Sequence, residues 1–506
     1  MQKKAELSTE DRDFFSLVVK AIYMNPFLDE RQEILSQISP PCYHDLTIGP
    51  KLNERIERLE RKGLNKIQHF GEEGGRLIRH AYLYQEFIRF DSDFAQLIQN
   101  QIKSPAAPLT VDFADHSITR LQSRGFSKDE ALRYFALLYQ IQRSFHFISG
   151  ALVGDCRSMK NLRIALWNNV FTYDIGLYDQ HLWNRMEDFS TLLLGETGTG
   201  KGSAAAAIGR SGFIPFDSKK GRFANSFMET FITINLSQFP ESLIESELFG
   251  HRKGAFTGAV EDHEGLFARC SVHGALFLDE IGDISIPVQI KLLQVLQERT
   301  FTPVGSHSDK RFEGRVIAAT NRSVERLRKQ DRFRDDFFYR LCSDIITVPT
   351  LRQRIKESSS ELEQMVNLII TRMTGEESSK LTDMILETFK RDLPAGYTWP
   401  GNVRELEQAI RRILLTQHYY GDNMIGSSLE EAFTEKIHAG TLTASELLNQ
   451  YCNLLYARYG TYQKVARVTG LDARTVKKYL LKKEGYVRNP DFGMKVDSQD
   501  TFDYAQ

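Results

Sequence analysis

The 506-residue chain has few cysteines, no long apolar run and almost no net charge. Its five cysteines are scattered and form no C-x-x-C pair, which argues for a reducing, cytoplasmic compartment and against a zinc site. No apolar run approaches the roughly 20 residues that cross a bilayer, and the first residues are too polar for a signal peptide. With a net charge of −1, any affinity for nucleic acid or membrane must be local.

The composition is otherwise that of a globular protein, with 41% hydrophobic and 26% charged residues. Several domains are expected, because single hydrophobic cores rarely grow beyond roughly 250–300 residues. Residues 1–150 predict a helical regulatory or sensory domain with a break at 104–108. They lack an alternating βα pattern with an acidic cluster, which argues against a phosphoacceptor domain. The sequence does not identify a ligand for this region.

Two helices of this region have clear patterns. Ser127 and Glu130 form a capping box, and the helix that it opens has an apolar stripe. Residues 84–98 predict a second amphipathic helix. His146 could ligate a metal or haem, but a packed or surface histidine is the favoured interpretation. The stripe consists of Leu132, Phe135, Leu138, Ile141, Phe145 and Ile148.

The stretch at residues 191–203 has the order strand, glycine-rich loop and helix that a phosphate-binding loop requires. Gly195, Gly198 and Gly200 are expected to take backbone angles that a Cβ would forbid. The N–H groups of the loop would then face the β- and γ-phosphates at the positive end of the helix, and Lys201 would add a full charge. An ordinary glycine turn is the alternative.

A hydrolase also needs groups that hold a metal and activate water. Gly202 stands where Ser or Thr usually contacts magnesium, and Ser203 comes one place late, so another group must hold the metal or the site is weak. The apolar run 275–278 ends in a pair of carboxylates. We expect Asp279 to hold Mg²⁺, directly or through water, and Glu280 to orient and polarise the attacking water. A solvated strand end is the alternative, but after a phosphate-binding loop the pair predicts an ATPase with a parallel sheet.

Between these motifs, two glycines flank Phe256 and Thr257. This pattern indicates a mobile loop with an aromatic tip, and a plain surface loop is the alternative. The surrounding run ESELFGHRKGAFTGA resembles the signature of bacterial enhancer-binding proteins, the AAA+ activators of sigma-54 RNA polymerase. In that family this loop contacts sigma-54 and moves with the nucleotide cycle. The resemblance therefore implies sigma-54 contacts by Gly254, Ala255, Phe256, Thr257, Gly258 and Ala259.

The resemblance extends over most of the chain after residue 150. It implies that Asn235 pairs with the catalytic glutamate and couples it to the loop, and that Asn321 is a first sensor near the γ-phosphate. It further implies that Arg334 and Arg340 act across a subunit boundary, a contact typically worth roughly 10³–10⁵ in rate, although a surface ion pair is the alternative. Family members usually carry Glu where this chain has Gly202. The implied ATP-binding set is Gly195, Glu196, Thr197, Gly198, Thr199, Gly200, Lys201, Gly202 and Arg404.

Two segments, 152–195 and 201–231, are longer than is usual in the family. We interpret both as surface additions. The first contains an aromatic-rich stretch at 166–183, which we expect to dock the N-terminal domain. The helical periodicity after the hinge at 348–352 resembles the family's lid. In the lid, WPGNVREL matches the second sensor and would direct Arg404 towards the phosphates.

Near the C-terminus, two short helices around Gly470 predict a helix-turn-helix in a locally basic segment, and a helical hairpin with a charged face is the alternative. Its position matches the Fis-like DNA-binding domain of the family. The expected core consists of Val465, Ala466, Leu471, Val476 and Leu480. The side chains expected to face DNA are Arg474, Thr475, Lys477, Lys478 and Lys482, with Lys483 also on phosphates.

The expected fold is therefore multidomain α and α/β. A helical N-terminal domain (1–150) precedes an AAA+ P-loop α/β core (151–350), a helical lid (351–435), a Fis-like helix-turn-helix (440–485) and a disordered tail (486–506).

Three functions agree with this organisation. The first is a sigma-54-dependent activator that forms a ring, expected to be a hexamer, binds upstream double-stranded DNA and hydrolyses ATP with Mg²⁺. The second is a DNA-binding regulator that senses nucleotide with little turnover, because of Gly202. The third is an AAA+ remodeller of another substrate. ATP turnover separates the first two, and the effect of Thr257→Ala on the true partner separates the first from the third.

Overall fold

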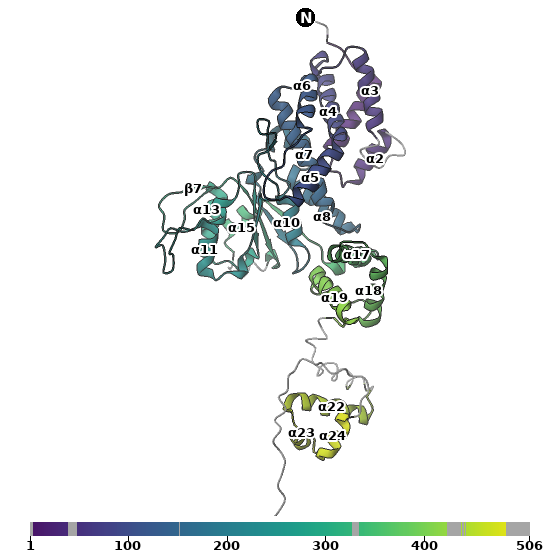
Figure 1. Cartoon of the computed structure of the whole chain (residues 1–506), viewed down its shortest axis with the longest axis vertical. Coiled ribbons are helices and arrows are strands. Elements are labelled where there is room, and N and C mark those ends of the chain that lie inside the picture. The colour runs from purple at the N-terminus through teal and green to yellow at the C-terminus, as the bar shows by residue number, and fades with distance from the viewer. Residues whose placement is uncertain are drawn as a thin grey trace, which may run out of the picture. The chain divides into compact units, whose positions relative to one another are not determined.

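The computed structural model describes residues 4–38, 48–150, 152–325, 333–421, 437, 440 and 442–481. The chain divides into two compact units, Met1–Gln417 and His418–Gln506 (Figure 1). None of the described helices has both the length and the apolar character that a membrane crossing requires.

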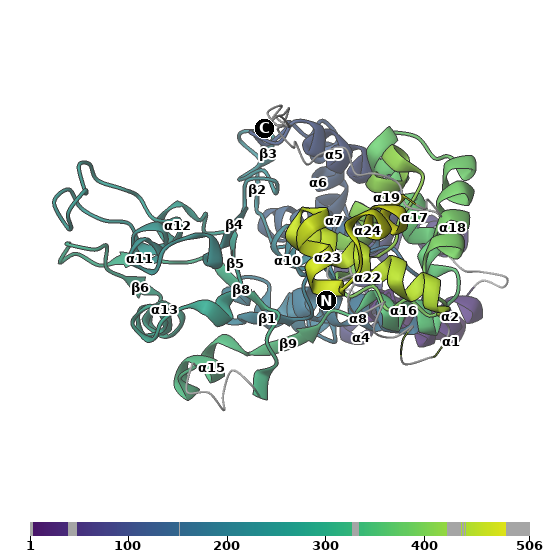
Figure 2. The same cartoon turned by 90° about the horizontal axis from the view of Figure 1, so that it is seen from below.

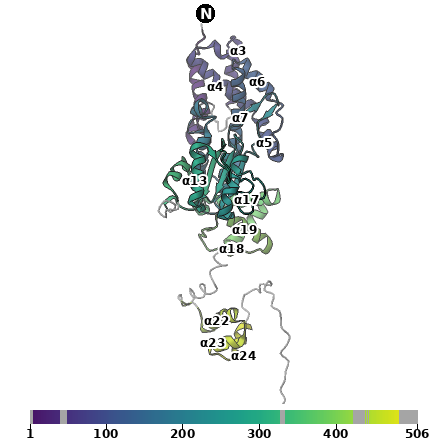
Figure 3. The same ribbon diagram turned by 90° about the vertical axis from the view of Figure 1, so that its left-hand side faces the viewer.

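The N-terminal part of the first unit is helical, as predicted (Figures 1 and 3). The predicted break is confirmed, because α5 ends at Lys103 and α6 begins at Ala114. The capping box is also confirmed: Ser127 N donates to Glu130 Oε2 at 2.9 Å, and Glu130 N donates to Ser127 Oγ at 3.2 Å. The helices are α1 (Thr9–Tyr23), α2 (Asp29–Ile38), α3 (Gly49–Arg61), α4 (Glu72–Arg89), α5 (Asp91–Lys103), α6 (Ala114–Ser123) and α7 (Lys128–Gly150).

Two details of the helix predictions were wrong. Residues 84–98 belong to two helices, because α4 ends at Arg89 and α5 begins at Asp91. The prediction of a single apolar stripe on α7 was also wrong, since Phe145 is 42% exposed while Gln140 and Arg143 on other faces are buried. Helix α7 is buried on several sides because it packs against neighbours in the helical part and in the α/β part.

A five-stranded parallel sheet forms the centre of the α/β part, with strand order β4-β5-β8-β1-β9. Alternate residues of each strand point to opposite faces. Leu193 and Phe277 belong to the core on the face covered by α10, whereas Leu192 and Leu276 belong to the core covered by α13 (Figure 2). The strands are β1 (Thr191–Leu194), β4 (Phe231–Asn235), β5 (Ala275–Asp279), β8 (Arg315–Thr320) and β9 (Asp344–Thr347).

Helices cover both faces of this sheet (Figure 2). Because the β1 loop leads directly into α10, the glycine-rich segment lies at the carboxyl edge of the strands. Two small antiparallel ladders lie outside the sheet, β2 (Phe216–Asp217) with β3 (Arg222–Phe223) and β6 (Thr300–Phe301) with β7 (Lys310–Arg311). The helices are α8 (Arg157–Phe171), α10 (Lys201–Gly209), α11 (Glu241–Phe249), α12 (Leu266–Arg269), α13 (Ile286–Glu298) and α15 (Asp335–Leu341).

The first long segment docks the helical part onto the core, as expected. Tyr134 Oη donates to Asp179 Oδ2 at 3.0 Å, and Arg133 forms an ion pair with the same carboxylate. Trp167 and Tyr178 of this segment are buried. The stretch is therefore part of the core rather than a surface addition.

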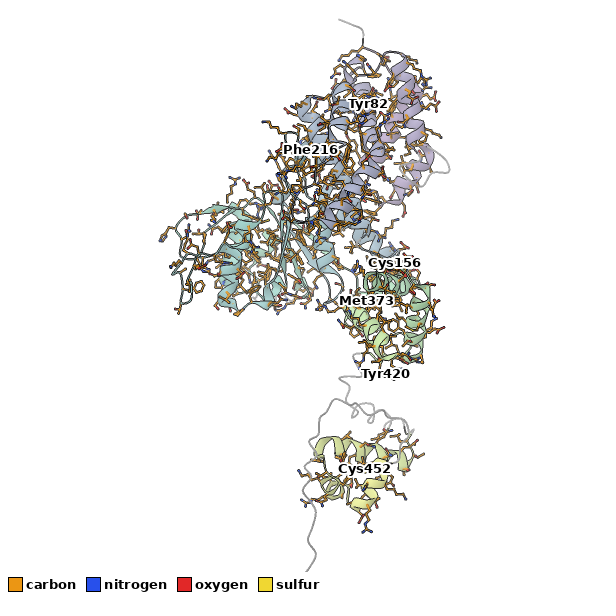
Figure 4. All side chains as sticks on the ribbon, viewed as in Figure 1. Tyr82, Cys156, Phe216, Met373, Tyr420 and Cys452 are labelled. Atoms are coloured by element: carbon orange, nitrogen blue, oxygen red, sulfur yellow. The ribbon has the colours of Figure 1, made fainter. Side chains whose placement is uncertain are left out.

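The second long segment is not a surface addition either, which corrects the sequence interpretation. The ring centroids of Phe223 and Tyr139 of α7 lie 4.2 Å apart, and those of Phe216 and Phe135 lie 5.0 Å apart. Figure 4 labels Phe216 where the helical part meets the sheet. A single hydrophobic core consequently extends from α7 through these aromatic residues to α10.

Four lid helices follow the sheet. A buried ion pair joins Arg354 and Glu361 at 2.7 Å, and Glu361 Oε1 accepts from Cys156 N at 2.8 Å (Figure 4). The segment before α8 is therefore attached to the lid. Residues 422–435, at the end of the predicted lid, lie outside the described residues. The helices are α16 (Leu351–Glu357), α17 (Glu361–Thr374), α18 (Ser379–Asp392) and α19 (Asn402–Thr416).

The second unit contains α22 (Ala444–Tyr459), α23 (Tyr462–Thr469) and α24 (Ala473–Leu481). Gly470 has a φ of 71°, so glycine suits the turn between the last two helices. The predicted core is confirmed: two of its members are buried and three pack against them. Cys452 of α22 is fully buried among them, which the sequence did not predict (Figure 4). The expected tail, 486–506, lies outside the described residues.

Candidate nucleotide site and partner loop

The loop after β1 has the backbone of a phosphate cradle. Gly198 and Gly200 have φ of 79° and 101°, the left-handed region that favours glycine, as predicted. For Gly195 the predicted reason was wrong. Its φ is not positive, but a Cβ there would lie 2.8 Å from Thr199 Oγ1 and 3.0 Å from Val348 O. Glycine is needed at this position for close packing rather than for its backbone angles.

Lys201 is the first residue of α10 and is buried. Its ammonium donates to the carbonyls of Gly195 at 2.8 Å and Glu196 at 3.2 Å. Burial lowers the pKa of Lys201, while the nearby carboxylates of Glu280 and Asp279 act in the opposite direction. The lysine therefore lies between the loop and the acidic pair.

The acidic pair closes β5, as predicted. Asp279 is the last residue of the strand, and its Oδ1 accepts from Glu280 N at 3.0 Å. Glu280 has a φ of 55°, a strained conformation of the kind found at functional sites. Burial raises the pKa of Glu280, Lys201 lowers it, and Asp279 raises it further. This carboxyl therefore holds its proton more tightly than an exposed glutamate.

The two predicted asparagines differ in their contacts. Asn321 Nδ2 donates to Thr197 Oγ1 at 3.1 Å, which links the end of β8 to the loop. Asn235 stands opposite Asp279 in the β4–β5 register, but its Oδ1 accepts from Ser237 N at 3.0 Å and Ser237 Oγ at 2.7 Å. Both residues are described, and no hydrogen bond joins Asn235 to Glu280. The structure therefore brings Asn321 into the site and leaves Asn235 beside it.

The lid closes one side of the loop. Val403 N donates to Gly198 O at 3.0 Å. A Cβ on Gly198 would lie 2.2 Å from Gly401 O and 3.0 Å from Arg404 Cβ. Arg404 is exposed and its charge contributes to the lowered pKa of Lys201. The predicted second sensor thus begins directly against the cradle.

Sequence reasoning missed two residues that hold loop and lid together. Asn402 is fully buried, and its Nδ2 donates to Thr197 O at 3.1 Å and Glu196 Oε2 at 3.2 Å. Arg352 forms a two-pronged ion pair with Glu196, which lowers the pKa of that carboxyl. The sequence did contain a signal for Asn402, which directly follows Pro-Gly. Asparagine tolerates the left-handed backbone conformation, and Asn402 adopts it.

The two predicted arginines do not contact the nucleotide loop of their own chain. Arg334 donates to Asp336 through Nε at 3.0 Å and Nη2 at 2.7 Å, an exposed pair. Arg340 Nε donates to Leu296 O at 2.9 Å and so joins α15 to α13. Within one chain, Arg334 therefore forms the surface ion pair that the sequence analysis gave as the alternative to a role at the subunit boundary.

The GAFTGA segment forms a tight turn at residues 254–259. Gly254 N donates to Ala259 O at 2.8 Å, and both glycines of the turn have positive φ. Phe256 is 37% exposed and contacts the His251 ring edge-on at 4.9 Å. Arg252 N donates to Val304 O at 2.9 Å, so the turn lies against the β6–β7 loop (Figure 2). The base of the turn is therefore hydrogen-bonded to the β6–β7 loop, and the tip residues Phe256 and Thr257 are exposed to solvent.

In the second unit, Arg474, Lys477 and Lys478 are exposed on α24, while Thr475 is half-buried. Arg474 N donates to Asp472 Oδ1 at 2.7 Å at the start of the helix. The predicted contacts Lys482 and Lys483 lie outside the described residues. The described part of α24 therefore has an exposed basic face.

Comparison with known proteins gives one family match, the Sigma-54 interaction domain, over residues 179–347. Regulatory protein AtoC of Escherichia coli K12 is 39% identical over 226 residues, 45% of this chain and 45% of that protein. Transcriptional regulatory protein GlrR of the same organism is 35% identical over 303 residues, 59% of this chain and 63% of that protein. DNA-binding transcriptional regulator NtrC of Azospirillum brasilense is 38% identical over 245 residues, 48% of this chain and 46% of that protein.

The alignments therefore span about half of these relatives, or at most 63% of one of them. Among solved structures, NtrX from Brucella abortus in complex with ADP has a TM-score of 0.42 and 20% identity, covering 76% of this chain and 85% of that one. A likeness of this size carries no argument about function.

Proposed function

Since this chain belongs to the bacterial enhancer-binding proteins, the sigma-54-dependent AAA+ activators, we propose that it hydrolyses ATP to remodel the sigma-54 RNA polymerase closed complex. The observation that carries the proposal is the convergence on one loop of a lysine, an acidic pair, a sensor asparagine and the start of the lid. An ordinary glycine turn, the alternative for this loop, would not require a lysine, two carboxylates and an asparagine beside it.

In the proposed site, the loop N–H groups and Lys201 bind the phosphates, and Arg404 neutralises charge from the lid side. Glu280 orients the attacking water, and its raised pKa makes it a better proton acceptor than an ordinary glutamate. Asn321 holds the loop near this carboxyl.

Magnesium fits the same edge of the sheet. Among the described residues, no group of three or more His, Cys, Asp or Glu side chains could hold a metal ion alone. Mg²⁺ is usually bound by one or two carboxylates together with substrate phosphates. We assign Asp279 as its protein ligand, with the nucleotide supplying others, and Mg²⁺ would neutralise phosphate charge.

The positions of Arg334 and Arg340 support a role between subunits. Neither guanidinium contacts the loop of its own chain. In a ring, expected to be a hexamer, they would reach the nucleotide of the neighbouring subunit. The Phe256–Thr257 tip would press on sigma-54, and residues 461–483 would bind upstream double-stranded DNA.

ATP turnover by the purified chain tests this proposal. Wild type is expected to hydrolyse ATP, and Lys201→Ala is expected to lose both nucleotide binding and turnover. Equal rates for the two proteins would remove the catalytic function. They would favour a regulator that senses nucleotide with little turnover, an alternative supported by Gly202.

Thr257→Ala tests the partner. This residue is exposed in the 254–259 turn and belongs neither to the nucleotide loop nor to the acidic pair. ATPase activity should therefore remain while sigma-54-dependent transcription is lost. Retained activation by Thr257→Ala would instead indicate another remodelled substrate.

A further inference from the structure

His251 lies at the base of the GAFTGA turn, and its backbone is fixed on both sides. On one side, His251 N donates to His263 O at 3.0 Å, and His263 N donates to His251 O at 2.9 Å. The two imidazole rings stack with their centroids 5.5 Å apart. On the other side, Val304 N donates to Gly250 O and Arg252 N donates to Val304 O, both at 2.9 Å. The His251 side chain therefore extends from a firmly held position.

This side chain contacts two different elements. Its Nδ1 lies 2.7 Å from Oγ of Ser246, a buried residue in the last turn of α11. Its ring meets the Phe256 ring edge-on, with the centroids 4.9 Å apart. Among the described residues, no other aromatic ring contacts Phe256. The imidazole consequently joins α11 to the aromatic residue at the tip of the turn.

A neighbouring carboxylate holds the backbone of the turn rather than its tip. Asp262 Oδ1 accepts from Lys253 N at 2.7 Å, and its Oδ2 accepts from Arg252 Nη1 at 2.6 Å. Both partners precede the turn. Asp262 therefore fixes where the turn starts, whereas His251 reaches the Phe256 side chain.

Helix α11 leads from the proposed nucleotide site to this histidine. It begins at Glu241, shortly after Asn235, the residue that stands opposite Asp279 in the β4–β5 register. A helix of nine residues is held by its own backbone hydrogen bonds, so its two ends move together. A displacement of α11 near the acidic pair would consequently reach the imidazole.

We propose that His251 is a positioning residue for the tip: its ring holds Phe256, and its Nδ1 links this contact to Ser246. The inference rests on the proposed function, because it assigns the residue that carries a movement of α11 to the sigma-54 contact. An edge-on aromatic contact favours the packed arrangement by roughly 2- to 12-fold. The contact is therefore strong enough to orient Phe256 and weak enough to change when the helix moves.

The test places para-fluorophenylalanine at position 256 of the full chain. Site-specific incorporation gives one ¹⁹F signal, although the chain has 33 phenylalanines. In the wild-type background this signal should differ from its value in urea and should move when adenylyl-imidodiphosphate binds. The measurement needs no variant to fold. A native signal at the urea value would mean that the ring at position 256 is not held, and it would overturn the inference.

His251→Asn keeps a polar atom near the position of Nδ1 and removes the ring. The ¹⁹F signal should then move to its urea value, and the sigma-54 concentration for half-maximal activation should rise about 2- to 12-fold while ATP turnover is unchanged. His307→Asn, the same change at an exposed histidine of the β6–β7 loop, should alter neither measurement. An unmoved signal in His251→Asn would show that the imidazole does not hold the tip.

His251→Phe and Ser246→Ala keep a ring at position 251 and remove the hydrogen-bonding contact. In both variants the ¹⁹F signal should stay away from its urea value but lose its movement on binding adenylyl-imidodiphosphate. A role in folding alone would not separate the position of the signal from its response to nucleotide. A response of wild-type size in either variant would overturn the role of the Ser246 contact.

Failure of the proposed function would give different results. That function fails if the wild-type chain binds no adenylyl-imidodiphosphate, or if Thr257→Ala retains sigma-54-dependent transcription. The comparison with urea and the signal of His251→Asn would still decide whether His251 holds Phe256.

Discussion

Asn402 connects the lid to the nucleotide loop, so its removal should uncouple them. Its Nδ2 donates to Glu196 and Thr197, and its Oδ1 accepts from Leu351 N at 2.9 Å. Each buried hydrogen bond is worth about 0.5–1.5 kcal/mol net. Asn402→Gly, which keeps the φ of 54° without strain, should therefore destabilise the fold by about 2–3 kcal/mol.

Asn402→Ala adds backbone strain to the same loss. A Cβ residue in the left-handed region costs roughly 1–2 kcal/mol, and alanine lacks the local hydrogen bonds with which asparagine offsets it. The alanine variant should therefore be about 1 kcal/mol less stable than the glycine variant. Both should bind nucleotide more weakly, because the lid no longer holds the 196–197 segment.

Thermal unfolding and calorimetric titration of a non-hydrolysable ATP analogue check this prediction. Thr416→Ala, in the last turn of the same helix, is the control and should leave nucleotide affinity unchanged. Wild-type affinity in Asn402→Gly would mean that this side chain does not join the lid to the loop.

Three further predictions concern the cradle. Gly198→Ala should abolish nucleotide binding, because its Cβ would collide with Gly401 O. Gly200→Ala places its Cβ where no atom lies within 4 Å, so it should cost only the roughly 1–2 kcal/mol of backbone strain. Equal effects of the two changes in nucleotide-binding assays would contradict this. Glu280→Gln should stop turnover and raise the melting temperature at neutral pH. Because the pKa of Glu280 is raised, its charged form lowers the stability of the fold once the pH exceeds the pKa of this group in the unfolded chain. The higher melting temperature of Glu280→Gln should therefore disappear in acid. A difference in melting temperature that persists in acid would contradict this explanation. Gly202→Ser should fold normally, since an added Cβ meets nothing within 4 Å, and should lower the Mg²⁺ concentration for half-maximal ATPase; an unchanged requirement would mean that the hydroxyl does not reach the metal.

The elements that sequence predicted well are those specified locally. The strand, loop and helix around Lys201 follow from a glycine pattern and an apolar run, and the β5 end follows from Asp279 and Glu280. The small core around Val465 and Val476 follows from helical spacing within one short segment.

The features that sequence missed depend on contacts between distant segments. Arg352 and Asn402 matter because the lid folds back onto Glu196. Periodicity in α7 could not predict its buried faces, because their partners, such as Phe223, come from a later insertion. The cradle role of Gly195 likewise depends on Val348 of another strand's end.

Mixing two inactive variants tests the proposal that nucleotide is hydrolysed between neighbouring subunits. Lys201→Ala lacks a working loop, and Arg334→Ala lacks an exposed arginine whose ion pair among the described residues is with Asp336, so both should fold. If the arginine acts in the neighbouring subunit, an equal mixture should recover about a quarter of wild-type ATPase activity, since half of the loops work and half of their neighbours supply the arginine. A mixture as inactive as either variant alone would contradict the account.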